Sequence, residues 1–241
     1  MPTHDLIGAI ELTASAAILV GALAAIQPES VARLRVAALL GGWFALVVVA
    51  AALQLFDPHI GLGAPAMGFA VLAPVVALAY AARRSPAIQA AVLAAPAPLL
   101  IGIHVVRVLG VSFVLLYAEN RLPAPFAPLA GWGDIFIGLT ALPVAWMVSR
   151  QASGWRAVAL AWNSLGVLDL VTAIGFGITS AEGSPIRLIF TEPSTALMSS
   201  LPWILIPALL VPLLMAIQLA VFYRLASTRP HARDTGGLAR A

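Results

Sequence analysis

The sequence predicts an all-α protein of the membrane, a polytopic bundle of seven transmembrane helices. The first observation is composition: 61% of the 241 residues are hydrophobic and 10% are charged, whereas soluble domains are about half apolar and about a quarter charged. The second is length, because seven apolar stretches each reach the roughly 20 residues that cross a bilayer. The third is that arginine alternates between the ends of these stretches. We therefore expect the lipid bilayer to be the solvent of this chain.

The first three spans are separated by short polar or proline-containing breaks, which interrupt a membrane helix. The residues after the third span, 87–97, are apolar as well but are interrupted by proline, so six or eight spans remain alternatives to seven. We expect these spans at residues 6–26, 34–56 and 64–82, followed by the breaks Gln-Pro-Glu-Ser (27–30), Asp-Pro-His (57–59) and Arg-Arg-Ser-Pro (83–86).

The last four spans are joined by two long connections, 118–128 and 179–200, which are either ordinary loops stiffened by proline or flaps over a cavity. The last span carries Pro202, Pro207 and Pro212, and interior proline frees a backbone carbonyl and bends a helix. We expect a kinked seventh helix that lines a cavity. These spans are expected at 98–117, 129–149, 156–178 and 201–225, within a transmembrane domain of residues 1–226 followed by a disordered, Arg-rich tail at 227–241.

The arginines predict the orientation of the bundle. Ten lie in the turns after spans one, three and five or at the C-terminal end, two lie on the other side, and Arg107 lies inside a span. Loops rich in arginine stay in the cytoplasm. We therefore expect the N-terminus outside, the C-terminus in the cytoplasm, and the cytoplasmic (inner) membrane of a bacterium as the location.

The residues that are missing exclude several kinds of chemistry. The chain has no cysteine, which excludes disulfides, thiolate metal sites and iron–sulfur clusters. All 13 basic residues are arginine, so a Schiff base to retinal or pyridoxal is excluded because it needs a lysine amine. The arginines form no patch with aromatic residues, so we do not expect nucleic acid as a partner. No cofactor, metal or catalytic residue is predicted, and enzymatic activity is not favoured.

Ionisable and amide residues inside the predicted spans mark the candidate site, because a charge in mid-membrane costs at least about 2.5–3.5 kcal/mol and usually faces the bundle interior. With a rise of about 1.5 Å per residue, Arg107 and Asp169 lie about 15 Å from the outer ends of their helices. We expect them to pair, with Asp134 as the alternative partner of Arg107. Gly131 and Gly138, at positions i−3 and i+4 from Asp134, would let a neighbouring helix approach this carboxylate. The complete set of candidate ligand- or ion-binding residues is Arg107, Asp134, Asp169, His104, Asn163 and Glu11.

The charge count leads to three hypotheses about function. One arginine can neutralise one carboxylate, and a carboxylate left without a basic partner in lipid is expected to bind and release a proton. This favours transport of a small solute or ion, proton-coupled, through a polar cavity in the outer half. The alternative is a non-transporting sensor or accessory subunit whose buried charges are structural. The third is an intramembrane enzyme, which would need Ser164 and His104 as a dyad.

The stretch His-Val-Val-Arg-Val-Leu-Gly to Gly-Trp-Gly-Asp, residues 104–134, resembles a signature of uncharacterised multi-pass inner-membrane proteins of bacteria. The later pieces Trp-Asn-Ser-Leu-Gly-Val-Leu-Asp-Leu and Ile-Pro-Ala-Leu-Leu-Val-Pro-Leu-Leu fit the same resemblance. It implies a seven-helix bacterial membrane protein without an assigned activity. It also implies that Arg107, the loop 122–127 and the pair Gly133-Asp134 form one unit.

Overall fold

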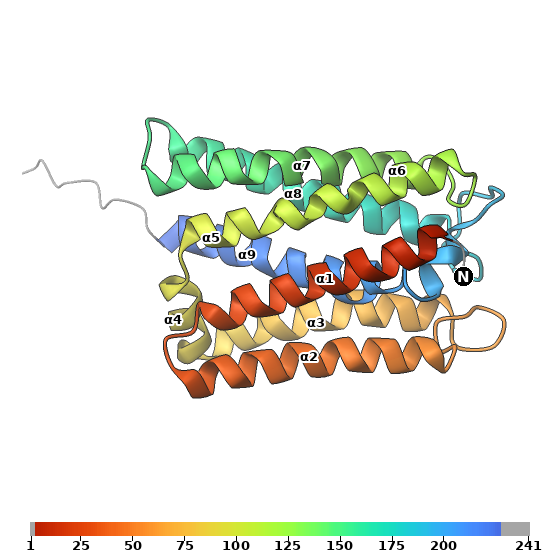
Figure 1. Ribbon diagram of the computed structural model, residues 1–241, viewed down its shortest axis with the longest axis horizontal. Coiled ribbons are helices and arrows are strands. Elements are labelled where there is room, and N and C mark those ends of the chain that lie inside the picture. The colour runs from red at the N-terminus through yellow and green to blue at the C-terminus, as the bar shows by residue number, and fades with distance from the viewer. Residues whose placement is uncertain (1–2, 228–241) are drawn as a thin grey trace, which may run out of the picture.

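The computed structural model describes residues 3–227, and within this range it is a bundle of helices without strands (Figure 1). The predicted tail, apart from Ser227, lies outside the described residues. Seven segments are long and apolar enough to cross a membrane. Five are single helices: α1 (Thr3–Ala25), α2 (Ser30–Ala52), α3 (Ala64–Arg84), α7 (Phe126–Ser149) and α8 (Trp155–Thr179).

The other two spans are composite. The fourth span joins α5 (Ala97–Gly102), the 3₁₀ helix η1 (Ile103–Gly110) and α6 (Val111–Ala118). The seventh joins the π-helix η3 (Ile206–Leu210) to α9 (Val211–Ser227). Irregular turns inside a membrane helix occur where the backbone is buried in protein, and four of the eight residues of η1 and three of the five residues of η3 are buried.

The structure confirms seven apolar segments of spanning length and decides the two doubtful regions. Residues 86–94 form the nine-residue helix α4 (Pro86–Ala94), which is capped by Ser85 and is too short to cross a bilayer. The seventh span begins at Ile206 rather than at residue 201. Pro202 therefore lies in the turn before the span, which corrects the expectation of three interior prolines; Pro207 and Pro212 do lie within it.

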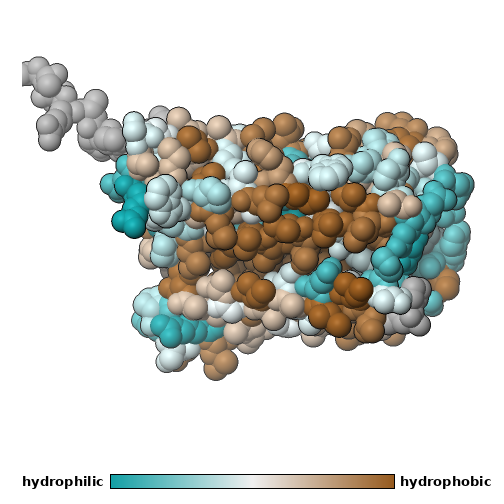
Figure 2. Space-filling view, turned by 45° about the horizontal axis from the view of Figure 1, so that its top comes forward, coloured by the Kyte–Doolittle hydropathy of each residue, from teal (hydrophilic) through white to brown (hydrophobic). Residues whose placement is uncertain are grey.

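The outside of the bundle is apolar along most of its length. Residues with large apolar side chains, such as Leu39 and Phe69, are 73% and 76% exposed, and α2 buries only Leu40 and Val47. Figure 2 shows apolar residues across the middle of one face and hydrophilic residues towards both ends. Such a belt is suited to acyl chains, and the seven apolar helices are compatible with an integral membrane protein.

Helix α7 lies at the centre of the most closely packed part of the bundle, between α8 on one side and the α5–η1–α6 span on the other. Glycines allow these backbones to approach. A β-carbon added to Gly131 would lie 2.9 Å from the Gly110 carbonyl oxygen, and one added to Gly138 would meet the backbone of Val108. Small residues of this kind let membrane helices pack backbone to backbone. The same approach brings the polar side chains of the three spans together.

Candidate functional site

Arg107 is the centre of an ion-pair cluster formed by three spans. Its side chain is 1% exposed. Nε donates to Oδ1 of Asp134 on α7 at 2.6 Å, Nη2 donates to Oδ2 of Asp169 on α8, and Nη1 donates to the Gly166 carbonyl at 3.3 Å. The expected pairing of Arg107 with Asp169 is present, and Asp134 is a second partner rather than an alternative. We call Asp134, Arg107 and Asp169 the triad.

The 3₁₀ geometry of η1 aims Arg107 at its partners. A 3₁₀ helix has three residues per turn, so side chains at i and i+3 lie in line. His104, Arg107 and Gly110 follow this spacing and are all buried. In an α-helix each of these residues would be rotated by about 60° from the one before it. The short turn therefore places a small residue and the guanidinium on the same face, against α7.

Two further glycines make room for the cluster. A β-carbon on Gly133 of α7 would overlap the carboxylate of Asp169, and a β-carbon on Gly166 of α8 would overlap the amide of Gln218. Gly166 is also the residue whose carbonyl accepts from Arg107. Gly133 thus leaves open the space that the triad carboxylate of Asp169 occupies, and Gly166 leaves open the space of the Gln218 amide beside it.

The triad contains one guanidinium and two carboxylates, so its formal charge is −1 when both aspartates are ionised. The side chains of Asp134 and Asp169 are 17% and 14% exposed. An unbalanced charge at this depth of a bilayer is costly. A proton or another cation at one carboxylate would remove the imbalance, which is the chemistry that this arrangement can perform.

A second polar cluster lies beside the triad. His104, Asn163 and Gln218 are each 0% exposed. Asn163 donates from Nδ2 to the Gln218 carbonyl at 3.0 Å, and the His104 ring meets the Trp162 ring edge-on at a centroid distance of 5.5 Å. Both His104 nitrogens, Oδ1 of Asn163 and both amide atoms of Gln218 have no hydrogen-bond partner among the described residues. Buried polar groups of this kind are costly unless they are satisfied.

Two residues of the sequence hypotheses lie elsewhere. The carboxylate of Glu11 on α1 accepts from Ser112 of α6 at 3.0 Å and, within the described chain, forms no ion pair with Arg107. Ser164 lies on the exposed face of α8, where its hydroxyl donates to the Leu160 carbonyl. Since His104 is fully buried, the structure gives no support to a Ser164–His104 dyad. Glu11 belongs to the α1–α6 contact rather than to the triad.

Asp169 also lines a groove on the outside of the bundle between α7 and α8, which we call the α7–α8 groove. The groove has a volume of about 760 Å³. Its other walls are mostly apolar, and Gly133 lies beside Asp169 among them. The triad is thereby connected to a surface that acyl chains cover. The lining side chains with the largest exposure belong to Leu129, Trp132, Phe136, Leu165 and Leu168.

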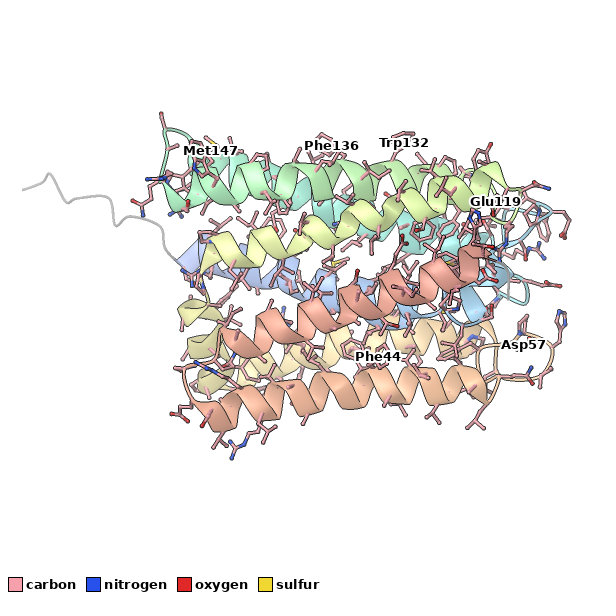
Figure 3. The ribbon with its side chains drawn as sticks, viewed as in Figure 1. Phe44, Asp57, Glu119, Trp132, Phe136 and Met147 are labelled. Carbon is pink, nitrogen blue, oxygen red and sulfur yellow. The ribbon has the colours of Figure 1, made fainter. Side chains whose placement is uncertain are left out.

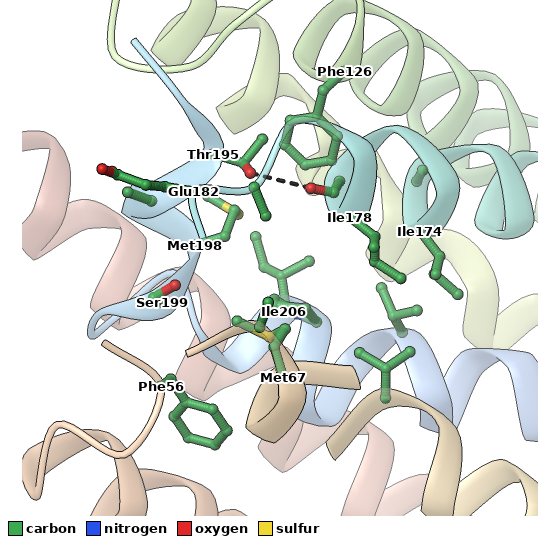
Figure 4. A pocket seen from close by; sticks show the side chains of 18 of the residues that line it. Phe56, Met67, Phe126, Ile174, Ile178, Glu182, Thr195, Met198, Ser199 and Ile206 are labelled. Atoms are coloured by element: carbon green, nitrogen blue, oxygen red, sulfur yellow. Dashed lines mark hydrogen bonds between the residues drawn. The ribbon is translucent and has the colours of Figure 1, made fainter. Parts of the chain in front are cut away.

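A smaller cavity of about 90 Å³ lies towards the N-terminal end, between α3, α8 and η3 (Figure 4). The connection 179–200, with its 3₁₀ helix η2 (Thr195–Ser199), supplies part of the lining of this cavity. Apolar side chains such as Met67, Ile174 and Met198 line it, and Figure 4 shows the carboxylate of Glu182 directed away from its centre. This cavity differs from the polar one that we expected in the outer half.

Sequence reasoning missed Gln218 and the Gly166 carbonyl. Gln218 lies in the middle of the seventh span, and a mid-span amide is the same signal that identified Asn163. The contact of the Gly166 carbonyl with Arg107 could not be predicted, because every residue carries a carbonyl and only packing selects one. The described residues contain no cluster of three or more His, Asp or Glu side chains placed to hold a metal.

Residues 64–226 match a family that is described as a domain of unknown function (DUF8737). The match begins at the first residue of α3 and ends one residue before the end of α9, so it contains the complete triad and excludes α1 and α2. No curated protein and no solved structure matches the chain. The resemblance to an uncharacterised family is thereby supported at the level of the family.

Proposed function

The chain belongs to the DUF8737 family, and we propose that this member moves a small solute or ion across a membrane by binding and releasing a proton at the triad. The region that defines the family contains Arg107, Asp134 and Asp169. The proposal therefore concerns the part of the chain that the family match covers, with α1 and α2 as an addition to it.

The observation that carries the proposal is the excess carboxylate. Arg107 makes ion pairs with both aspartates, so one negative charge has no basic partner within the triad. Proton binding at one carboxylate would neutralise the site, and proton release would charge it. A site that changes charge in mid-membrane changes its affinity for a charged substrate, which is the basis of coupling.

The arrangement of the ends supports the orientation that we propose, with the N-terminus outside and the C-terminus in the cytoplasm of a bacterium. The described termini lie at opposite ends of the bundle (Figure 1). Arg33, Arg83, Arg150 and Arg224 lie at or near span ends that share one side with the C-terminus, as the seven alternating spans require. Loops rich in arginine remain in the cytoplasm.

Proton exchange can be tested without knowledge of the substrate. The purified chain in detergent is titrated against a pH-sensitive dye, and the protons bound per chain are compared between wild type, Asp169→Asn and Asp134→Asn. The control is Glu29→Gln, a change of an exposed carboxylate whose side chain makes no capping hydrogen bond. We expect each triad variant to lose one exchangeable proton near neutral pH relative to the control. Equal proton binding by all four proteins, each folded, would contradict the proposal.

Transport itself is then measured in liposomes. A proton gradient is imposed across the vesicles, and substrate-dependent proton movement is followed with an enclosed dye. We expect Asp169→Asn and Arg107→Gln to abolish this movement, because either change alters the charge balance of the triad. Flux unchanged in both folded variants would exclude the triad as the coupling site.

A second candidate function is a sensor or accessory subunit in which the triad only holds helices together. The observation that favours it is that each of the three guanidinium nitrogens of Arg107 donates to a protein acceptor. Under this candidate, replacing all three residues by neutral ones (Arg107→Gln, Asp134→Asn and Asp169→Asn together) restores much of the stability lost in Arg107→Gln alone. Under the same candidate, the triple variant also keeps the biological activity of the protein. A stable triple variant that has lost activity would favour transport.

A further inference from the structure

We propose that the α7–α8 groove binds a lipophilic cation, an organic cation with an apolar body that reaches Asp169 from the lipid. This inference rests on the proposed function and names its class of substrate. It is carried by the contact between the triad and the groove: a membrane carboxylate whose cluster has one negative charge in excess lines an apolar, aromatic surface.

The walls of the groove suit an apolar body. Trp132 and Phe136 are 62% and 53% exposed and lie four residues apart, one turn of α7, so both rings are on the same face. Figure 3 shows both side chains pointing away from the bundle. Leu165 and Leu168 form the opposite wall on α8. The volume of about 760 Å³ is within the range of about 300–1,000 Å³ that small-molecule sites occupy.

The floor of the groove suits a positive charge. Oδ2 of Asp169 accepts from Arg107, while Oδ1 lies beside Gly133, which itself lines the groove. The charged groups that face Asp169 are Arg107 on η1 and Asp134 on α7. Their sum with Asp169 is formally −1. When both aspartates are ionised, an anion in the groove would be repelled, and a neutral molecule would leave the excess charge in place.

The aromatic rings add selectivity for a cation. An organic cation over the face of an indole or phenyl ring gains about 0.5–2 kcal/mol, with the larger value where water is excluded. Trp132 and Phe136 flank Gly133, which lies beside the Asp169 carboxylate in the lining of the groove. A ligand with its charge at Asp169 can therefore place its apolar groups against both rings.

Binding of the cation would exchange with the proton. In the resting site a proton neutralises one carboxylate; when the cation enters, this proton leaves to bulk water and the carboxylate becomes the counter-ion. One positive charge arrives and one departs, so the net charge of the site is unchanged. This exchange couples movement of the cation in one direction to movement of a proton in the other.

The probe is the tetraphenylphosphonium cation, and its matched control is tetraphenylborate, an anion of the same shape and size. Equilibrium dialysis measures binding of each ion to the full chain in phosphatidylcholine nanodiscs, with empty nanodiscs subtracted because both ions enter lipid. We expect saturable binding of one phosphonium ion per chain, no saturable binding of the borate, and affinity at least tenfold lower in Asp169→Asn.

Aromatic variants keep the test independent of triad stability. Trp132→Leu removes a ring of the groove, and we expect about fivefold weaker phosphonium binding, which corresponds to about 1 kcal/mol of cation–π energy. Trp146→Leu is the control, since Trp146 lies on the same helix and is 63% exposed but does not line the groove. We expect its affinity to equal that of wild type.

Three results would overturn the inference: equal binding of the two ions, no saturable binding of either, or equal losses in Trp132→Leu and Trp146→Leu. The groove would then be a surface for acyl chains. A dimer that is lost in Trp132→Leu would assign the groove to a second copy of the chain and would also overturn it. Failure of the proposed function would be seen in a different measurement. In that case wild type and Asp169→Asn would bind the same number of protons, whether or not the phosphonium ion binds.

Discussion

The carboxylate of Asp169 occupies the position where any residue other than glycine at position 133 would place its β-carbon. These two residues lie on adjacent spans, α7 and α8, so the polar centre and the closeness of the helices depend on the same missing side chain. The absence of a side chain at Gly133 therefore affects both the packing of α7 against α8 and the position of the carboxylate in the proposed site.

Gly133→Ala should destabilise the protein by about 1–3 kcal/mol, the usual cost of overpacking a closed site. The added methyl group must displace Asp169 and with it the ion pair to Arg107. Thermal unfolding in detergent measures the change. Gly68→Ala on α3 is the control, because a β-carbon there meets no atom within 4 Å, and alanine is the better helix former. Equal midpoints for both variants would show that Asp169 moves without cost.

Removal of Arg107 and removal of Asp169 should have unequal effects on stability. Asp169→Asn leaves the neutral pair Arg107–Asp134 and should cost about 1 kcal/mol, the worth of one hydrogen bond. Arg107→Gln leaves two carboxylates without their cation and should cost about 3–5 kcal/mol. Asp134, at 2.6 Å from Nε of Arg107, keeps the guanidinium paired when Asp169 is replaced. Unfolding in increasing SDS, followed by circular dichroism, would contradict this asymmetry if Asp169→Asn were the less stable variant.

The N-terminal end of α1 should depend on Asp5. Its Oδ1 accepts from Arg121 at 2.7 Å and from the Trp203 indole at 2.9 Å. Asp5→Ala removes both bonds and should lower stability by about 1–3 kcal/mol, because Trp203 is 2% exposed and its N–H would lose its partner. Limited proteolysis of the first span, with Glu29→Gln as the control, is the measurement. Unchanged cleavage would show that packing of Gly8 against the Trp203 ring holds α1 without Asp5.

Replacement of glutamine by methionine should change the stability of the protein in opposite directions at two positions, Gln218 and Gln89. Gln218→Met removes two buried amide atoms that lack partners in the described structure, and should raise stability by about 1 kcal/mol. Gln89→Met removes a hydrogen bond of 2.8 Å to the Ala82 carbonyl and should lower it by a similar amount. Unfolding midpoints of both proteins decide the signs. A loss of stability in Gln218→Met would mean that water or a ligand satisfies the amide.

Much of the fold follows from the sequence, because hydrophobic length and arginine position are properties of single segments. The third span begins at Ala64 in both prediction and structure, and the fifth ends at Ser149 in both. The start of the seventh span was wrong by five residues, since Pro202 is as apolar in context as Pro207 and only the backbone distinguishes a turn from a helix. The 3₁₀ and π segments were not predicted either, because they arise from packing against other spans.

The site was predicted in part for a similar reason. Depth along a helix placed Arg107 and Asp169 at one level, so their contact could be anticipated. Glu11 was also expected among the site residues, yet its carboxylate accepts a hydrogen bond from Ser112. Depth in the membrane gives the position of a side chain along one axis only. The direction in which the side chain points around its helix axis decides which neighbours it contacts. The glycines on α7 were the only part of the sequence that pointed to that direction correctly.

The tight winding of η1 has a mechanical consequence for the whole protein. Eight residues with a rise of about 2.0 Å instead of about 1.5 Å extend the fourth span by about 4 Å. If this stretch relaxed to ordinary α geometry, the fourth span would become shorter and the two ends of the bundle would move closer together along it. Gly110 would also turn away from α7. The 3₁₀ segment therefore fixes both the length of the fourth span and the position of Arg107, the arginine within the described spans that is predicted to lie far from water. A change in the winding of η1 would change the span length and the ion pairs of Arg107 together.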